Sequence, residues 1–142
     1  LWFAGFFDGE GAIMIAKNNR KTPPTYALRL DVSNTNRSVL ELVQKFLGGF
    51  LAKPRRNKSA FPGCKPVHHW VATDKTALAV LKLLQPYLLL KGPQANVAIV
   101  FQEGRYTYRR SLGNFNGRMQ LYEVDRRERL YQQMKALNRK GK

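Results

Sequence analysis

Apolar and polar residues alternate along several stretches of the chain, and this period of two predicts β-strands. Four strands are expected, over residues 12–19, 26–34, 50–53 and 67–73. The second is the clearest, because Leu28, Leu30 and Val32 fall on one face while Arg29 and Asp31 fall on the other. The apolar faces are expected to form the core, and the opposite faces to stay open to solvent or to a ligand.

Helices are predicted where apolar residues recur every three or four positions between capping residues. The first covers residues 1–11 and ends in two acids interleaved with glycines. Asn36 or Ser38 caps the second helix, which Gly48 ends. Later helices are expected over residues 74–84, from Pro93 through Phe101, and over residues 120–138. The basic stretch 104–118 between the last two is expected to be a loop.

The predicted order is helix–strand–strand–helix–strand–strand–helix, followed by further helices. This order is typical of an α+β fold whose strands form one antiparallel sheet. A sheet that helices cover on one face leaves its other face free for a ligand. Residues 1–142 are expected to form a single domain, with residues 103–142 as a C-terminal helical extension.

The charge of the chain points to a polyanionic partner. Lys and Arg number 25 against 9 Asp and Glu, which gives a net charge of +16. Such a charge attracts nucleic acid first and anionic membranes second. No apolar run approaches the roughly 20 residues of a membrane span, so no membrane partner is expected. The single cysteine, Cys64, excludes an intramolecular disulfide and fits a reducing compartment. An intracellular, non-secreted protein is therefore predicted.

Few residues have the type and the spacing that a catalytic or metal-binding site requires. His68 and His69 are adjacent, so on a strand they point to opposite faces and cannot bind one metal ion together. Glu10 stands out among the nine acids because it lies between glycines at a helix end, where its carboxylate is exposed but fixed. Asp8 either competes for the same role or caps and orients the turn. Paired carboxylates suit hard divalent cations, which prefer oxygen ligands.

Residues 3–11, which read FAGFFDGEG, resemble the signature helix of the LAGLIDADG homing endonucleases. A second shared segment covers Leu84–Lys91 and Gln94–Asn96, and the order of elements matches nearly the whole chain. The resemblance implies an αββαββα core with a saddle-shaped antiparallel sheet. It also implies a site-specific homing endonuclease that makes metal-dependent double-strand breaks.

The resemblance implies roles for four residues at the reacting phosphates. The Glu10 carboxylate and the Gly9 carbonyl would bind Mg²⁺, which Mn²⁺ would replace and which Ca²⁺ would mimic for binding without cleavage. Lys91 would assist near the phosphate, and Asn34 matches a polar residue that follows the second strand in the family. The family arginine of some relatives falls on or beside Ser38, so that part of the site departs from the pattern.

One signature motif per chain implies a homodimer, although it also fits half of a two-motif protein. Ala4 and Gly5 leave a notch without bulk where a second helix can pack closely. The interface is expected to contain Phe3, Ala4, Gly5, Phe7 and Asp8. Each subunit would cut one strand across the minor groove, which leaves short 3′ overhangs in a long, near-palindromic target.

The resemblance also implies a set of DNA-binding residues on the open face of the sheet and in its loops. Those residues are Met14, Ala16, Asn18, Arg20, Arg29, Asp31, Ser33, Lys53, Arg55, Arg56, His69 and Val71. Side chains on the strands would face bases, and the basic loop residues would mostly hold phosphates.

Two alternative functions use the same fold. An intron RNA maturase would bind intron RNA as a splicing cofactor, alone or together with endonuclease activity. A DNA-binding regulator would keep duplex binding and lose cleavage. Glu10 and Lys91 favour cleavage, because a binding protein gains nothing from an acid beside phosphates. An intron-bearing host places the protein in the cytoplasm, the nucleoid or an organelle.

Overall fold

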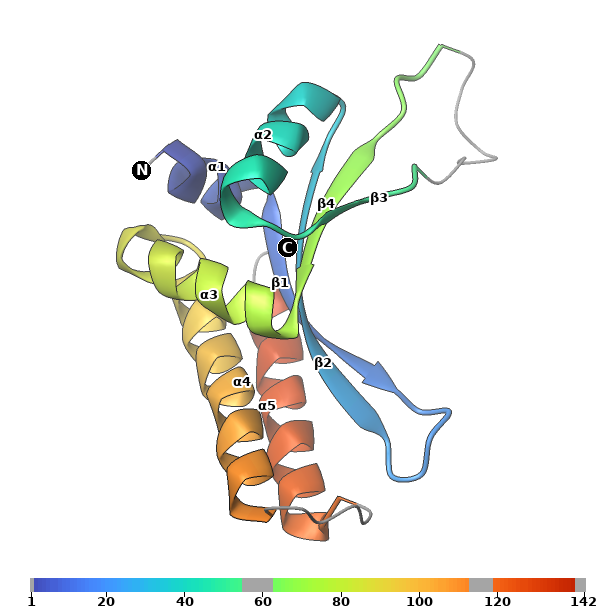
Figure 1. Ribbon diagram of the computed structural model, residues 1–142, viewed down its shortest axis with the longest axis vertical. Helices are drawn as coiled ribbons and strands as arrows, with labels where there is room; N and C mark the ends of the chain where they lie inside the picture. Colours follow the sequence, from blue (N-terminus) through green and yellow to red (C-terminus); the bar gives the residue numbers. More distant parts are fainter. Residues whose placement is uncertain (1, 55–62, 113–118, 140–142) are drawn as a thin grey trace.

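A computed structural model describes residues 2–54, 63–112 and 119–139 (Figure 1). The elements in chain order are α1 (Trp2–Glu10), β1 (Gly11–Asn18), β2 (Thr25–Asn34), α2 (Arg37–Leu47), β3 (Phe50–Ala52), β4 (His68–Thr73), α3 (Asp74–Leu84), the 3₁₀ turn η1 (Gln85–Tyr87), α4 (Gly92–Leu112) and α5 (Leu121–Arg139). The predicted αββαββα order is confirmed, with two C-terminal helices after it.

The strands form one antiparallel sheet in the order β1-β2-β4-β3. The helices lie on one side of the sheet (Figure 1). Ile13, Leu28, Leu30 and Val32 are at most 1% exposed on the helix side. Their partners in the alternation, such as Arg29, remain partly exposed on the outer face. The predicted assignment of strand faces is therefore confirmed for β1 and β2.

Caps set the limits of α2. The Asn36 side chain accepts a hydrogen bond of 3.1 Å from the Ser38 amide, so Asn36 is the N-cap. At the other end Gly48 and Gly49 adopt positive φ angles of 77° and 80°. The buried Trp70 indole donates a 2.8 Å hydrogen bond to the Gly48 carbonyl. The end of α2 is thereby tied to the centre of the sheet.

Helix α4 is longer than the sequence predicts. It continues through Gly104 to Leu112, so the expected loop is wrong over residues 104–112, and residues 113–118 lie outside the described part of the chain. Phe101, Gly104 and Tyr108 share one face at helical spacing, and α5 packs on that face. A Cβ at Gly104 would overlap the guanidinium of Arg126, so the glycine permits this close approach.

Helix α5 is fastened to the sheet by polar contacts. Glu128 accepts a hydrogen bond from the Tyr26 hydroxyl and pairs with Lys17 at 2.8 Å. Hydrogen bonds from Lys17 and Tyr26 lower the pKa of Glu128 to about 2. The Asn138 amide donates a 3.0 Å hydrogen bond to the Ile13 carbonyl. Helix α5 is thus held along β1.

No helix in the described part of the chain is long and apolar enough to cross a membrane.

Candidate active site

The end of helix α1 is held in place by Asp8. Its carboxylate is 7% exposed and accepts hydrogen bonds of 2.8–3.0 Å from the backbone amides of Leu89, Leu90 and Lys91. Burial raises the pKa of Asp8, but these amide hydrogen bonds outweigh it, and the pKa lies below its usual value. Asp8 therefore joins α1 to a segment more than 80 residues further along the chain.

This connection brings Lys91 to the two residues expected to bind metal. The Lys91 ammonium donates to the backbone carbonyl of Asp8, one residue before Gly9. Gly9 and Glu10 are both exposed, at the point where α1 ends and β1 begins. The structure thus places a carboxylate, a backbone carbonyl and an ammonium group at one end of the sheet.

Asn34 lies at the same end of the sheet. Gly11 pairs with Val32 in the β1–β2 ladder, and Asn34 follows Val32 by two residues. Asn34 therefore lies at the end of β2 that is next to the junction of α1 and β1. The Asn34 side-chain oxygen accepts a 2.7 Å hydrogen bond from the Asn36 amide, which orients the side chain in the turn before α2.

The residues at this end of the sheet fit a divalent cation by the chemistry of their atoms. The Glu10 carboxylate and the Gly9 carbonyl supply oxygen ligands, which Mg²⁺ and Ca²⁺ prefer. No heavy atom lies within 4 Å of the position that a Gly9 Cβ would take, so the backbone there is open to approach. Among the described residues, no group of three or more His, Cys, Asp or Glu side chains is placed to hold a metal ion.

The outer face of the sheet carries a polar network at its centre. Asp31 accepts a 3.0 Å hydrogen bond from Arg29 and lies 2.9 Å from Nδ1 of His69. These three side chains belong to two neighbouring strands, and each is partly exposed. Side-chain donors such as that of arginine, held on a sheet surface, can read base edges in a major groove. The network orients both donors before any ligand binds.

The remaining predicted DNA-binding residues occupy three different places. Met14, Ala16, Asn18 and Ser33 lie on the outer face, Arg20 and Lys53 are exposed beyond strand ends, and Arg55 and Arg56 fall outside the described residues. The Asn18 side chain accepts a 3.0 Å hydrogen bond from the Arg20 amide, which shapes the turn after β1.

The predicted base contact of Val71 does not agree with the structure. The alternation predicts that it faces bases, and it does point to the outer side of β4, but its side chain is 0% exposed. Asp31 on β2 and Phe50 on β3 are its cross-strand partners, and side chains on both neighbouring strands flank it. Val71 is therefore unavailable for base contact in this structure.

The predicted interface on α1 also needs correction. The sequence predicts Ala4, Phe7 and Asp8 at an interface with a second copy, but they are 2%, 0% and 7% exposed within one protomer. Phe3 is partly buried and packs edge-on against Trp70, with ring centroids 6.0 Å apart. These side chains face the core because they share one stripe of the helix. Of the five residues expected at the interface, Gly5 alone is exposed.

The free face of α1 consists of Trp2, Gly5 and Gly9, which are exposed, and Phe6, which is partly buried. Trp2 and Phe6 stack with a centroid distance of 5.6 Å and an interplanar angle of 4°. A Cβ added to Gly5 or to Gly9 would have no heavy atom within 4 Å. Glycine in a helix costs about 1 kcal/mol relative to alanine, and nothing among the described residues of the protomer requires it at either position. A stripe with this spacing permits a second helix to approach closely.

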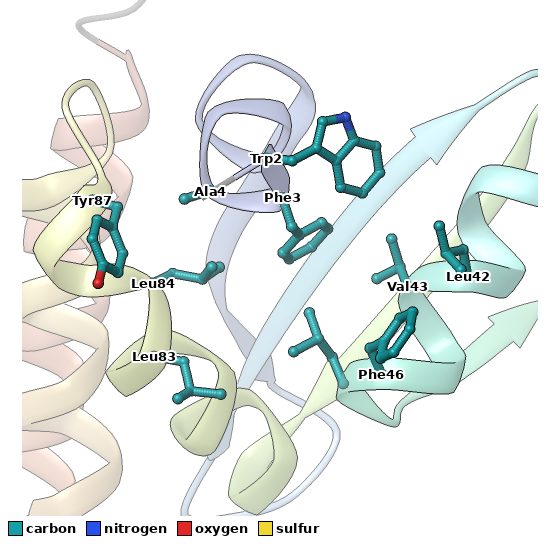
Figure 2. Close-up of a pocket in the computed structure, with 10 residues that line it drawn as sticks. Trp2, Phe3, Ala4, Leu42, Val43, Phe46, Leu83, Leu84 and Tyr87 are labelled. Atoms are coloured by element: carbon teal, nitrogen blue, oxygen red, sulfur yellow. The ribbon is translucent and has the colours of Figure 1, made fainter.

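An apolar groove adjoins this face. Figure 2 shows Trp2 and Phe3 of α1 on one side of it, with Phe46 of α2 and Leu83 of α3 along the others. Its volume is about 360 Å³, and Trp2, Phe46 and Leu83 are each at least 60% exposed. Apolar surface thus continues from α1 onto two other helices.

Replacing Asp8 by asparagine tests the connection between α1 and Lys91. Asp8→Asn removes one acceptor oxygen and the charge, and it turns an amide group towards backbone N–H donors. We expect a loss of about 2–4 kcal/mol in the free energy of unfolding at pH 7, measured by urea denaturation. Because the pKa of Asp8 is lower in the folded state, this contribution is present above about pH 4 and disappears as the pH falls below that value.

The matched control is Glu41→Gln, which removes an exposed carboxylate paired with Arg37 on α2. Its expected cost is below about 1 kcal/mol. Equal stability of Asp8→Asn and the unmutated protein would contradict the proposed anchoring role.

Comparisons with known proteins agree with the fold and with the family that the sequence resembles. The model of a family described as LAGLIDADG endonuclease matches residues 3–96. No curated protein sequence matches the chain. Similar folds are found in solved structures, with identities that support the fold alone.

Three of these structures are similar over most of this chain. The archaeal intron-encoded homing endonuclease I-Vdi141I, complexed with DNA, has a TM-score of 0.73 and 14% identity over 96% of this chain and 81% of its own. The homing endonuclease I-CvuI, in complex with its target in the presence of Ca, has a TM-score of 0.61 and 21% identity over 96% and 92%. I-LtrWI, a LAGLIDADG homing endonuclease bound to target DNA, has a TM-score of 0.71 and 13% identity over 94% and 43%.

Proposed function

The chain belongs to the LAGLIDADG endonuclease family, and from this premise we propose that it is a site-specific, divalent-metal-dependent DNA endonuclease that acts as a homodimer. The observation that carries the proposal is the position of Lys91, whose ammonium lies against the end of α1 beside Gly9 and Glu10. An acid, a carbonyl and a cation at the end of an open sheet suit hydrolysis of a phosphodiester.

Each residue at the site has a distinct proposed task. Glu10 and the Gly9 carbonyl hold the metal ion, and Lys91 donates to a non-bridging phosphate oxygen. When bound, Mg²⁺ supplies Lewis-acid stabilisation of the charge that develops on the scissile phosphate. Asn34, at the same end of the sheet, would help to orient the phosphate. The solved structures of I-CvuI with targets in the presence of Ca and of Mg support a divalent ion.

The outer face of the sheet would hold the duplex. Arg29 and His69 are oriented by Asp31 for contact with base edges in the major groove. The net charge of +16 supplies attraction to phosphates over a wider surface. Known relatives of this fold have been solved with DNA bound, which supports duplex DNA as the ligand.

A homodimer would form through the free face of α1. Gly5 and Gly9 allow two copies of the helix to cross closely, and the stacked Trp2 and Phe6 would cover the contact. Crossing helices bring the two Glu10 residues together at the centre of a duplex. Each protomer would then cut one strand, leaving short 3′ overhangs in a near-palindromic target.

A capture-then-cut selection tests this function. Randomised duplexes are enriched on the protein in Ca²⁺, transferred to Mg²⁺ or Mn²⁺, and sequenced at their ends. We expect staggered double-strand breaks at one near-palindromic site. Captured duplexes that stay intact in both ions would contradict cleavage. Failure to capture any duplex, together with binding of structured intron RNA, would replace the proposal with a maturase function.

A further inference from the structure

A second cavity lies on the helix side of the fold, where the first turn of α3 meets α4 and α5. Its volume is about 500 Å³, and charged lining residues come from all three helices. Lys75 belongs to α3, Arg105 and Arg109 to α4, and Arg127 to α5. Asp74 is the one carboxylate among the described lining residues. The lining therefore carries a net charge of about +3, from four cations and one anion.

Arg105 and Arg127 each use a single guanidinium nitrogen in their hydrogen bonds among the described residues. Arg105 donates to Asp74 at 2.7 Å and to Gln102 at 3.3 Å, which neutralises the single carboxylate among the described lining residues. The buried Arg127, 7% exposed, uses its Nε to donate to Glu123 at 2.8 Å. Its guanidinium also lies over the ring of Tyr108, 5.8 Å from the centroid. The lining cations thus keep further N–H donors, and the described lining residues supply few acceptors for them.

Tyr106 supplies an independent observation. Tyr106 lines the same cavity, and its hydroxyl is buried without a hydrogen-bond partner among the described residues. Buried hydroxyls in proteins are nearly always paired, because an unpaired one loses its hydrogen bond to water without replacement. An acceptor atom brought by a ligand would satisfy the Tyr106 hydroxyl.

The electrostatics of Arg127 agree with an excess of positive charge in this region. Burial lowers the pKa of Arg127, and the nearby guanidinium groups of Arg105 and Arg126 lower it further. Glu123 opposes this effect, but it is shared between Arg126 and Arg127. An anion in the cavity would relieve the repulsion between these arginines.

We propose that the cavity between α3, α4 and α5 binds a phosphate group through Arg105, Arg109, Arg127, Lys75 and the Tyr106 hydroxyl. Phosphate presents acceptor oxygens on every side, which match a lining rich in donors. Guanidinium groups also bind phosphate through two parallel N–H···O hydrogen bonds. The cavity is larger than one phosphate, so the group can be free or carried on a nucleic-acid strand. The site is separate from the outer face of the sheet and from Glu10.

Inorganic phosphate is the first probe. It is titrated into the full chain by calorimetry, with chloride adjusted to keep the ionic strength constant. We expect Arg109→Gln to weaken phosphate binding about tenfold, because a charge-assisted donor is lost. Arg110→Gln is the matched control, since Arg110 is an exposed neighbour on α4 that does not line the cavity. We expect that control to bind phosphate like the unmutated protein.

Tyr106→Phe distinguishes an effect on phosphate binding from an effect on folding. It removes one unpaired hydroxyl and keeps the ring, so the free protein should be at least as stable as before, while phosphate affinity falls about fivefold. A short single-stranded RNA is titrated in parallel. Weakening of both ligands by Tyr106→Phe assigns the site to nucleic-acid phosphates, and weakening of inorganic phosphate alone assigns it to the free ion. Equal losses in Arg109→Gln and Arg110→Gln, or no phosphate binding, would overturn the proposal.

Discussion

Glu10→Gln is expected to lower the rate of DNA cleavage by about 10³-fold or more while leaving binding of the same duplex unchanged. The substitution keeps the shape of the side chain and removes the charge that holds the metal ion. Glu10 is exposed at the end of α1, and it is not among the residues that hold the helix to the core. The fold should therefore survive, and the loss should fall on the chemical step alone.

The measurement compares single-turnover cleavage in Mg²⁺ with duplex binding in Ca²⁺, using the target recovered by selection. Glu103→Gln is the control, because Glu103 is a carboxylate on α4 that is half exposed and paired with Lys82. It should cleave at nearly the rate of the unmutated protein. Undiminished cleavage by Glu10→Gln would remove Glu10 from the metal site and assign the metal ion to another acid.

Gly5→Leu is expected to convert the dimer into a monomer and to abolish double-strand cleavage with it. Leucine at this position would fill the space that a crossing helix needs. Within the protomer, the position of the new Cβ has no heavy atom within 4 Å, so the core is not disturbed. The monomer should even gain up to about 1 kcal/mol in stability, because glycine is a poor helix former.

Light scattering gives the mass, and urea denaturation gives the stability of the same sample. Ala79→Leu is the control, since Ala79 is exposed on α3 and the substitution adds apolar surface to another helix. It should leave both the mass and the cleavage unchanged. A Gly5→Leu protein with the mass of a dimer would place the interface elsewhere, with the groove beside Trp2 as the next surface to mutate.

The sequence by itself determined the order of the elements and the faces of the strands β1 and β2. Alternation in β1 and β2 places Ile13 and Leu30 in the core and Arg29 outside, as observed. This inference works because the period of a strand is a local property, set by the backbone between neighbouring residues. The resemblance of residues 3–11 to a signature helix likewise identified the family, which the match over residues 3–96 confirms.

Local reasoning failed where long-range packing sets the outcome. The basic, tyrosine-containing stretch after Gly104 is typical of a loop, yet α5 packs against it and α4 stays helical to Leu112. Val71 alternates correctly but is buried by its neighbours in the sheet. Polarity and spacing are local, whereas burial depends on which other elements cover a residue.

The site shows the same division between local and tertiary information. Glu10 and Lys91 are recognisable from the sequence, but what holds them near each other is the Asp8 carboxylate, which accepts hydrogen bonds from amides 81 to 83 residues away. The free face of α1 was decided in the same way, because packing on the sheet turned Ala4 and Phe7 inward and left Gly5 and Gly9 outside. A chain specifies the period of each helix, and only its tertiary partners select which face remains exposed.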